Sequence, residues 1–187
     1  AMDSENIKGR AYAFGTWSAI KPVKRITLRP LLWLLRRLHL RLESTHFASW
    51  MIVPADHAAR VSSTESEVVL PRAYLLFLSA FNGEREEYLH ACWSLAGPAL
   101  AAIGSHCDRW PGARQLRAVL EYAGAHELFA DAFFNAYGDA TAADIRAALR
   151  LTRALEDFAL ASPPADPRHF RQRYERLLMA LGADLAA

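Results

Sequence analysis

A small set of aromatic, histidine and asparagine side chains has the types and spacing of a small-molecule site. Within residues 46–53, one side of an alternating run presents His46 and Trp50, and Tyr12 lies in a similar run. Such pockets combine apolar surface with a few hydrogen-bonding groups. The expected ligand-binding residues are Tyr12, His46, Trp50, Asn82, Asn135 and Tyr137. A half-buried, hydrogen-bonded histidine among core aromatics is the alternative interpretation.

The sequence gives weaker signals for a metal site, a haem ligand or a reactive cysteine. The 7 histidines and 2 cysteines do not occur at spacings typical of zinc sites, so no metal site is expected. Haem is the one cofactor with candidate ligands, because His90 and His169 fall on predicted helices. Cys107 lies beside His106 and Arg109, which would lower the pKa of the thiol, and a packed, unreactive thiol is the alternative.

Alternating side chains and turn residues predict the strands that position these groups. We expect strands at residues 11–20, 46–53 and 73–81, and a fourth in the second half of 128–137. The run at 73–81 is apolar on both faces, as in a central strand covered on each side. The polar stretch 55–72 is predicted to be a long loop.

Helical periodicity predicts the remaining elements. The first helix is expected to have Thr27 as its N-cap, and a later one Thr141. Gly97-Pro98 should kink the helix that begins after Gly83. Further helices are expected at 113–122 and 169–181, and a linker at 162–167. Leucines at helical spacing should face inward, at positions Leu31, Leu34, Leu35, Leu38, Leu42, Leu149, Leu151 and Leu155.

The predicted helix at 28–42 also carries a basic outer face. Its cationic residues, which surround Trp33, are Arg29, Arg36, Arg37 and Arg41. This face could attract an anionic membrane surface or an acidic partner, and an ordinary solvated face is the alternative. The formal net charge of the whole chain is only +2, so no nucleic-acid partner is expected.

The order of these elements predicts an α+β fold. Strand, helix, strand, strand, helix, strand is the ferredoxin-like βαββαβ pattern, with a four-stranded antiparallel sheet and additional C-terminal helices. We expect this domain over 9–160, and a linker with a C-terminal helix packed on the same domain over 161–187. Either the C-terminal helices or a second copy would cover the open sheet face, and a second copy would make a dimeric α+β barrel. An all-α fold, with 46–53 and 73–81 helical, is the alternative.

The stretches 9–12, 18–22, 45–50, 76–83, 134–138 and 145–149 share a pattern. In these stretches the chain resembles a family of bacterial proteins with a His-Phe-Ala-Arg-Trp strand motif. This chain has Ser49 where the family pattern has arginine. At the level of fold, the layout is similar to that of chlorite-dismutase-type and dye-decolourising-peroxidase-type haem enzymes and of small dimeric monooxygenases.

Together these patterns predict a homodimer that binds a small, largely apolar molecule in a pocket on the open sheet face. A haem- or oxygen-dependent enzyme is one form of this function. The alternative is a non-catalytic module that docks to an acidic partner or an anionic membrane surface through the helix at 28–42. The polar N-terminus has no basic-then-apolar leader, so a cytoplasmic location is expected.

Overall fold

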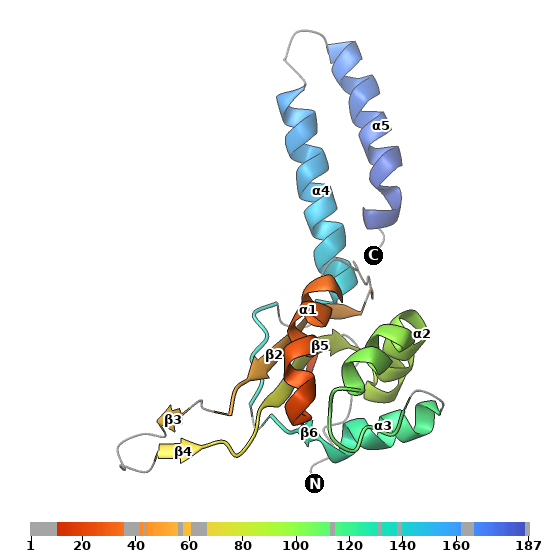
Figure 1. Cartoon of the computed structure of the whole chain (residues 1–187). Coiled ribbons are helices and arrows are strands. Elements are labelled where there is room, and N and C mark those ends of the chain that lie inside the picture. Colours follow the sequence, from red (N-terminus) through yellow and green to blue (C-terminus); the bar gives the residue numbers. More distant parts are fainter. Residues whose placement is uncertain are drawn as a thin grey trace. The chain divides into compact units, whose positions relative to one another are not determined.

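Helices form between several of the strands, and two long helices follow the last strand (Figure 1). The computed structural model describes residues 11–35, 42, 44–55, 58–60, 67–112, 115–130, 132–137, 140–161 and 167–185. The chain divides into two units, Ala1–Gly138 and Asp139–Ala187. In chain order the elements are β1 (Ala11–Ala19), the 3-10 turn η1 (Pro22–Lys24), α1 (Arg25–Leu35), β2 (Thr45–Val53), β3 (Ala58–Arg60), β4 (Glu67–Val69), β5 (Tyr74–Asn82), α2 (Arg85–Gly104), α3 (Leu116–Ala125), β6 (Glu127–Leu128), α4 (Ala142–Leu160) and α5 (Pro167–Leu185).

Unit 1 contains a four-stranded antiparallel sheet with the order β2-β5-β1-β6. β1 and β5 pair along their whole lengths, from Ala11 opposite Asn82 to Ala19 opposite Tyr74. β2 pairs with the other edge of β5, and the register shifts between Thr45 and Phe47. The predicted α+β class with a four-stranded antiparallel sheet is confirmed.

Helices α1, α2 and α3 pack on one face of this sheet. Leu28 of α1, Leu75 of β5 and Ile103 of α2 are buried in one cluster, against which Tyr122 of α3 packs. A second cluster joins the sheet to α2 through Phe81 and Tyr88, whose rings stack with centroids 4.0 Å apart. Burial of apolar side chains on this face is therefore what holds the helices to the sheet.

Helix α1 differs from its prediction in start and rotation. It begins at Arg25, directly after η1, and not at a Thr27 cap; the Thr27 hydroxyl lies 3.1 Å from the Lys24 carbonyl oxygen. Pro22 starts the turn earlier, because its fixed φ suits a first helical position. Leu28 is 0% exposed and therefore marks the face of α1 that points to the sheet. Leu34 lies on another side of the helix and is 58% exposed, so its predicted burial is wrong. Leu38, Arg36, Arg37 and Arg41 lie outside the described residues.

Two predictions between the main elements are corrected. The stretch 55–72 contains a short hairpin, β3 with β4, rather than only loop. The last strand is β6 at Glu127–Leu128, which pairs with Thr16 and Gly15, and not the second half of 128–137. A polar side chain competes with strand formation there, since Asn135 Oδ1 accepts a hydrogen bond from the Tyr137 backbone N–H at 3.2 Å.

The kink and the cap predicted from the sequence are confirmed. Ala96 has non-helical angles (φ −132°, ψ 16°) immediately before Gly97, where proline at 98 removes a donor. Thr141 caps α4 with a capping box, in which its hydroxyl accepts from the Asp144 N–H at 3.1 Å. The backbone and hydroxyl of Thr141 lower the pKa of the Asp144 carboxyl, because both hydrogen bonds favour its charged form.

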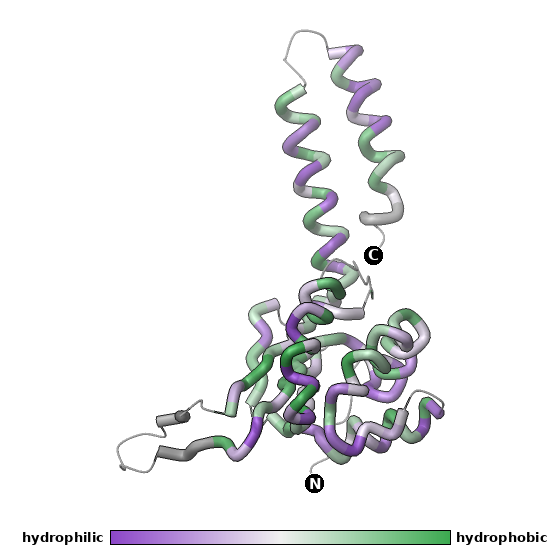
Figure 2. The backbone as a smooth tube through the Cα atoms, viewed as in Figure 1, coloured by the Kyte–Doolittle hydropathy of each residue, from purple (hydrophilic) through white to green (hydrophobic). Residues whose placement is uncertain are grey.

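Unit 2 consists of the helices α4 and α5. The Phe158 ring contacts Phe170 and Tyr174, with centroids 5.3 Å and 6.2 Å away. Hydrophobic and hydrophilic residues alternate along both helices (Figure 2). Leu149 and Leu155 are exposed within the described structure, so their predicted inward position is wrong. None of the described helices combines the length and apolar character needed to cross a membrane.

The rotation of α1 can be tested with two leucines on the same helix. Leu28→Ala removes fully buried methyl groups and should lower the free energy of unfolding by about 2–5 kcal/mol. Leu34→Ala removes an exposed side chain and should change it by less than about 0.5 kcal/mol. Denaturant unfolding measures both, and equal effects would contradict this rotation.

Candidate functional site

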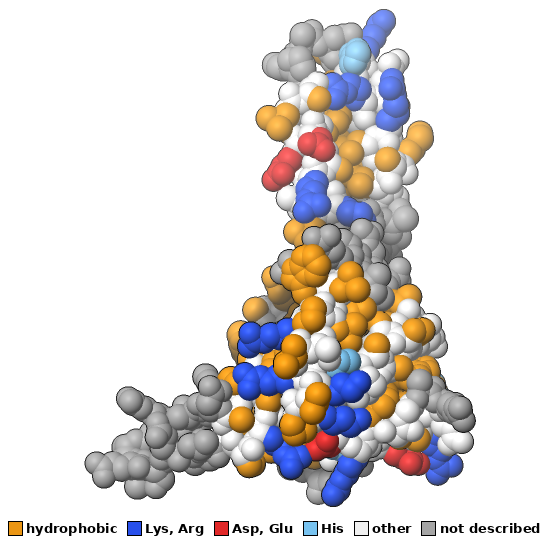
Figure 3. All heavy atoms as spheres, viewed as in Figure 1, with side chains coloured by type: hydrophobic (Ala, Val, Ile, Leu, Met, Phe, Trp, Pro, Cys, Tyr) orange, Lys and Arg blue, Asp and Glu red, His pale blue; other side chains and the backbone are white. Residues whose placement is uncertain are grey.

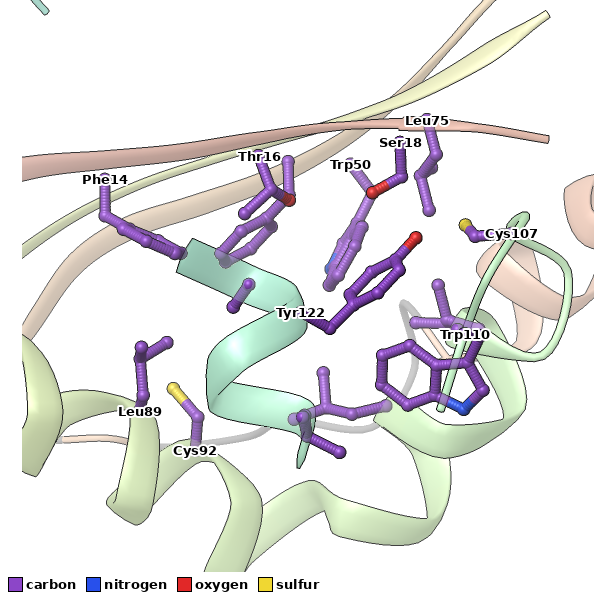
Figure 4. Close-up of a pocket in the computed structure, with 16 residues that line it drawn as sticks. Phe14, Thr16, Ser18, Trp50, Leu75, Leu89, Cys92, Cys107, Trp110 and Tyr122 are labelled. Atoms are coloured by element: carbon purple, nitrogen blue, oxygen red, sulfur yellow. The ribbon is translucent and has the colours of Figure 1, made fainter. Parts of the chain in front are cut away.

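A cavity of about 120 Å³ lies between the helix-covered face of the sheet and helices α2 and α3 (Figure 4). The sheet contributes one wall, and the two helices with the turn between them contribute the others. The lining residues are Phe14, Thr16, Ser18, Trp50, Leu75, Phe77, Leu89, Cys92, Leu100, Ile103, Gly104, Cys107, Trp110, Val119, Tyr122 and Ala123.

Strand alternation explains the sheet wall. Phe14, Thr16 and Ser18 are separated by two residues along β1, so their side chains share one face. Trp50 of β2 lies directly opposite Phe77 of β5, and their ring centroids are 4.3 Å apart. The aromatic wall thus comes from three adjacent strands.

Tyr122 is the central side chain of the helical wall. Its hydroxyl donates a hydrogen bond to the Asp108 backbone carbonyl at 3.1 Å. Its ring meets Trp110 edge-on at 5.2 Å and stacks on His126 at 4.1 Å. Figure 4 shows the hydroxyl directed toward the sheet, near Ser18. These contacts hold the phenol in one orientation at the side of the cavity.

The turn after α2 is tied to the end of β1 by backbone hydrogen bonds. The Asp108 N–H donates to the Ala19 carbonyl at 2.8 Å, and the Lys21 N–H donates to the His106 carbonyl at 2.9 Å. Lys21 Nζ donates to the Ser105 carbonyl at 3.0 Å, so its charge neutralises the negative end of α2. This attachment positions Cys107 beside the sheet, where it bridges to Ile20, and leads the chain on to Trp110 in the helical wall.

His106 strengthens this attachment. Its Nδ1 lies 2.8 Å from the Ala102 carbonyl, which can only accept, so Nδ1 is the donor. Nε2 lies 3.1 Å from the Thr27 hydroxyl and thereby joins α1 to the end of α2. The side chain of His106 is therefore a structural link between two helices.

Gly104 lets the Trp110 ring reach the cavity wall. A Cβ at position 104 would lie 2.4 Å from the Trp110 ring, closer than van der Waals contact permits. Only glycine therefore allows this close approach of the indole to the helix backbone.

The ionisable side chains that line the cavity, Cys92, Cys107 and Tyr122, are neutral at physiological pH. Burial raises the pKa of the Cys107 thiol to about 11, and the nearby Lys21 charge offsets this only in part. Burial also raises the pKa of Cys92 and brings that of Tyr122 to about 12. The lowered thiol pKa considered for Cys107 is wrong, and the packed, protonated thiol is the correct alternative.

Of the six predicted ligand-binding residues, only Trp50 lines this cavity. Tyr12 packs against Phe81, with centroids 6.5 Å apart. His46 falls at the register shift of β2, and its Nε2 is buried without a hydrogen-bond partner among the described residues.

The three residues predicted for the rim lie elsewhere. The Asn82 backbone N–H donates to the Ser44 carbonyl at 2.8 Å. Asn135 forms the local turn with Tyr137, whose side chain is exposed. The structure does not place these three in the cavity wall, and a pocket on the open sheet face stays a prediction.

The sequence interpretation missed the helical wall. Tyr122, Trp110 and Gly104 come from the segment after the kink, in which no ligand-binding residue was predicted. The turn-forming run Trp110-Pro111-Gly112 was the available signal that a tryptophan is held in a connection rather than in a helix.

The cavity does not fit haem. No histidine is among its lining residues, and its volume is below the roughly 300 Å³ at which pockets for drug-sized ligands begin. Both candidate ligands, His90 and His169, are on the exposed surface. In the described part of the chain, no three His, Cys, Asp or Glu side chains are grouped to hold a metal ion.

Comparisons with protein-family models, with curated proteins and with solved structures found no match to this chain. The chemical content of the cavity is therefore the main guide to function.

The pKa of Cys107 makes stability depend on alkaline pH. The thiol is protonated in the folded protein up to about pH 11, while the unfolded chain releases its proton near pH 9.0. Between these values the unfolded state binds fewer protons, so the free energy of unfolding should fall as pH rises, by on the order of 2–3 kcal/mol. Cys107→Ala should reduce this slope, measured by denaturant unfolding across that range, and an unchanged slope would contradict the assignment.

Proposed function

We propose that the protein binds a small, neutral, largely apolar molecule in the cavity between the sheet and helices α2 and α3. The observation that carries this proposal is a lining without a charged side chain around a volume of about 120 Å³. Apolar cavities of about 150 Å³ hold benzene or xenon. The volume therefore suits a ligand with about one ring.

The walls favour an aromatic ligand. Rings from both sides face the cavity, namely those of Phe14, Trp50, Phe77, Trp110 and Tyr122. Aromatic pairs in offset or edge-on arrangements gain about 0.5–1.5 kcal/mol beyond area burial. A planar guest would make such contacts with several of these rings.

Two hydroxyl groups could orient one polar group of the ligand. Thr16 and Ser18 lie on the sheet wall, and Ser18 is almost fully buried. A hydroxyl can donate or accept, so an alcohol or a carbonyl would suit this wall. A carboxylate would lose its hydration without a cationic partner, which costs far more than the loss of a neutral group. The cavity should therefore bind uncharged molecules and exclude carboxylates.

Benzyl alcohol and benzoate test this selection because they share a ring and a size but differ in charge. At neutral pH, benzyl alcohol should raise the Tm in a concentration-dependent way and benzoate should not. Ala123→Leu fills the cavity with three further carbon atoms and should abolish the shift.

The matched control is Ala125→Leu, an exposed position in the same helix that does not line the cavity. It should bind benzyl alcohol as the parent protein does. Stabilisation by benzoate equal to that by benzyl alcohol, or an undiminished shift in Ala123→Leu, would contradict the proposal.

We also propose that unit 1 has the ferredoxin-like arrangement and that a second copy covers its open face. β1 and β2 both run antiparallel to β5, which lies between them, so the pair joined by α1 is a split βαβ unit. This order supports the arrangement, with β3 and β4 as an insertion.

Exposed apolar side chains on the uncovered face support dimerisation. Phe47 and Met51 of β2 are each 51% exposed, and Leu78 of β5 lies beside them. Trp17 and Tyr74 stack on the same face, with centroids 4.7 Å apart. In a two-fold symmetric dimer, this patch would pack against the same patch of the second copy, and both patches would be removed from water.

Charge on this face should prevent dimerisation. Phe47→Glu and Met51→Glu should each shift the mass measured by light scattering from dimer to monomer, because a dimer would bury the carboxylate. Met179→Glu, at an exposed position in α5, is the control and should remain dimeric. A parent protein that is monomeric at all concentrations would contradict the dimer and leave the cavity proposal unaffected.

A further inference from the structure

The outer surface of η1 and α1 is apolar where a solvated helix face would be polar. Val23 and Ile26 are 84% and 81% exposed, and Trp33 and Leu34 are more than half exposed. Ile26 and Trp33 lie seven residues apart, on the side of α1 opposite Leu28. The helix therefore has a buried apolar stripe against the sheet and a second, separate apolar row toward the outside.

Basic side chains flank this row. Lys24 and Arg29 are exposed and Arg25 is half-buried, while residues 21–35 contain no Asp or Glu. Within the described residues these three cations form no ion pair. Figure 3 shows hydrophobic and basic side chains intermingled over α1. We call Val23, Lys24, Arg25, Ile26, Arg29, Trp33 and Leu34 the α1 outer surface.

Apolar and cationic side chains that are mixed in this way match an anionic bilayer surface. The apolar groups can enter the boundary between headgroups and acyl chains, while Lys and Arg stay with the anionic headgroups. Tryptophan is enriched at this interface because its ring is amphipathic. Residues 21–35 contain no acidic side chain that anionic headgroups would repel.

The degree of exposure favours a lipid surface over a protein partner. Side chains that are more than four-fifths exposed project from the surface, and a protein partner would need a matching hollow for each. A bilayer deforms around such groups and needs no matching shape. Docking also leaves the inner stripe of α1 in place, because Leu28 and Leu35 remain packed on the sheet.

We infer that the α1 outer surface binds peripherally to anionic membranes, with α1 lying in the plane of the interface. The binding is independent of the cavity, since no residue of this surface lines it. It should weaken with ionic strength, because it combines apolar insertion with attraction of cations to anionic lipid.

Vesicle sedimentation with the full chain tests this inference. The probes are vesicles of equal parts phosphatidylcholine and phosphatidylglycerol, and vesicles of phosphatidylcholine alone. The protein should bind the anionic vesicles at about 0.01 M salt, bind them less at about 0.15 M, and bind the zwitterionic vesicles at least tenfold more weakly.

Two double variants separate the contributions. Lys24→Gln with Arg29→Gln should lower the partition coefficient about fivefold for each residue. Val23→Ser with Ile26→Ser should lower it about tenfold or more, because two inserted aliphatic side chains are lost. Both pairs are exposed, so circular dichroism should show unchanged folding.

The matched controls lie on unit 2. Arg153→Gln removes an exposed cation and Met179→Ser removes an exposed apolar side chain, and neither should change binding. Absence of binding to anionic vesicles at low salt would overturn the inference. So would equal binding to both vesicle types, or binding that the α1 double variants leave unchanged. Binding to polyglutamate that matches binding to the anionic vesicles would also overturn it, in favour of an acidic protein partner.

Discussion

The central strands β1 and β5 carry apolar side chains on both faces of the sheet. Helices α1, α2 and α3 pack on only one of these faces. This one-sided covering is the constraint on which the other features depend. On the covered side, rings and leucines must share space with three helices, and the space they leave is the cavity. On the other side, Phe47, Met51 and Leu78 remain in contact with solvent in the single chain.

The cavity owes its form to backbone attachments rather than to packing alone. The turn after α2 is hydrogen-bonded to the end of β1, which places Cys107 at the sheet. The kink at Ala96 redirects the second half of α2, and Gly104 admits the Trp110 ring. Tyr122 completes the wall with its hydroxyl satisfied by a backbone carbonyl. Since the ionisable side chains that line the cavity, Cys92, Cys107 and Tyr122, are neutral, the proposed ligand class follows from the environment that the fold creates.

Local patterns in the sequence were sufficient for much of the fold. Period-two alternation located β1, and apolar runs bounded by turn residues located β2 and β5, each within a residue or two. Gly97-Pro98 located the kink in α2. Thr141 was predicted as a cap from its residue type before a helical pattern, and the structure adds Asp144 as its capping-box partner. The residues of the candidate site were harder to predict from the sequence. Trp50 was found from its strand, whereas Tyr122 and Trp110 reach the cavity through contacts with residues far away in the chain.

What the sequence by itself determined is the set of elements with local causes: strand alternation, the cap, the kink and the neutral, aromatic composition of the core. The tertiary structure decided the rotation of α1, the brevity of β6 and the sheet face beside which the cavity lies. The rotation of a leucine-rich helix depends on which leucine fits the surface beneath it, and both Leu28 and Leu34 satisfy the same local pattern. Long-range packing distinguishes them, because only one arrangement buries Leu28 against Ile20 and Leu75 and leaves an apolar row outside.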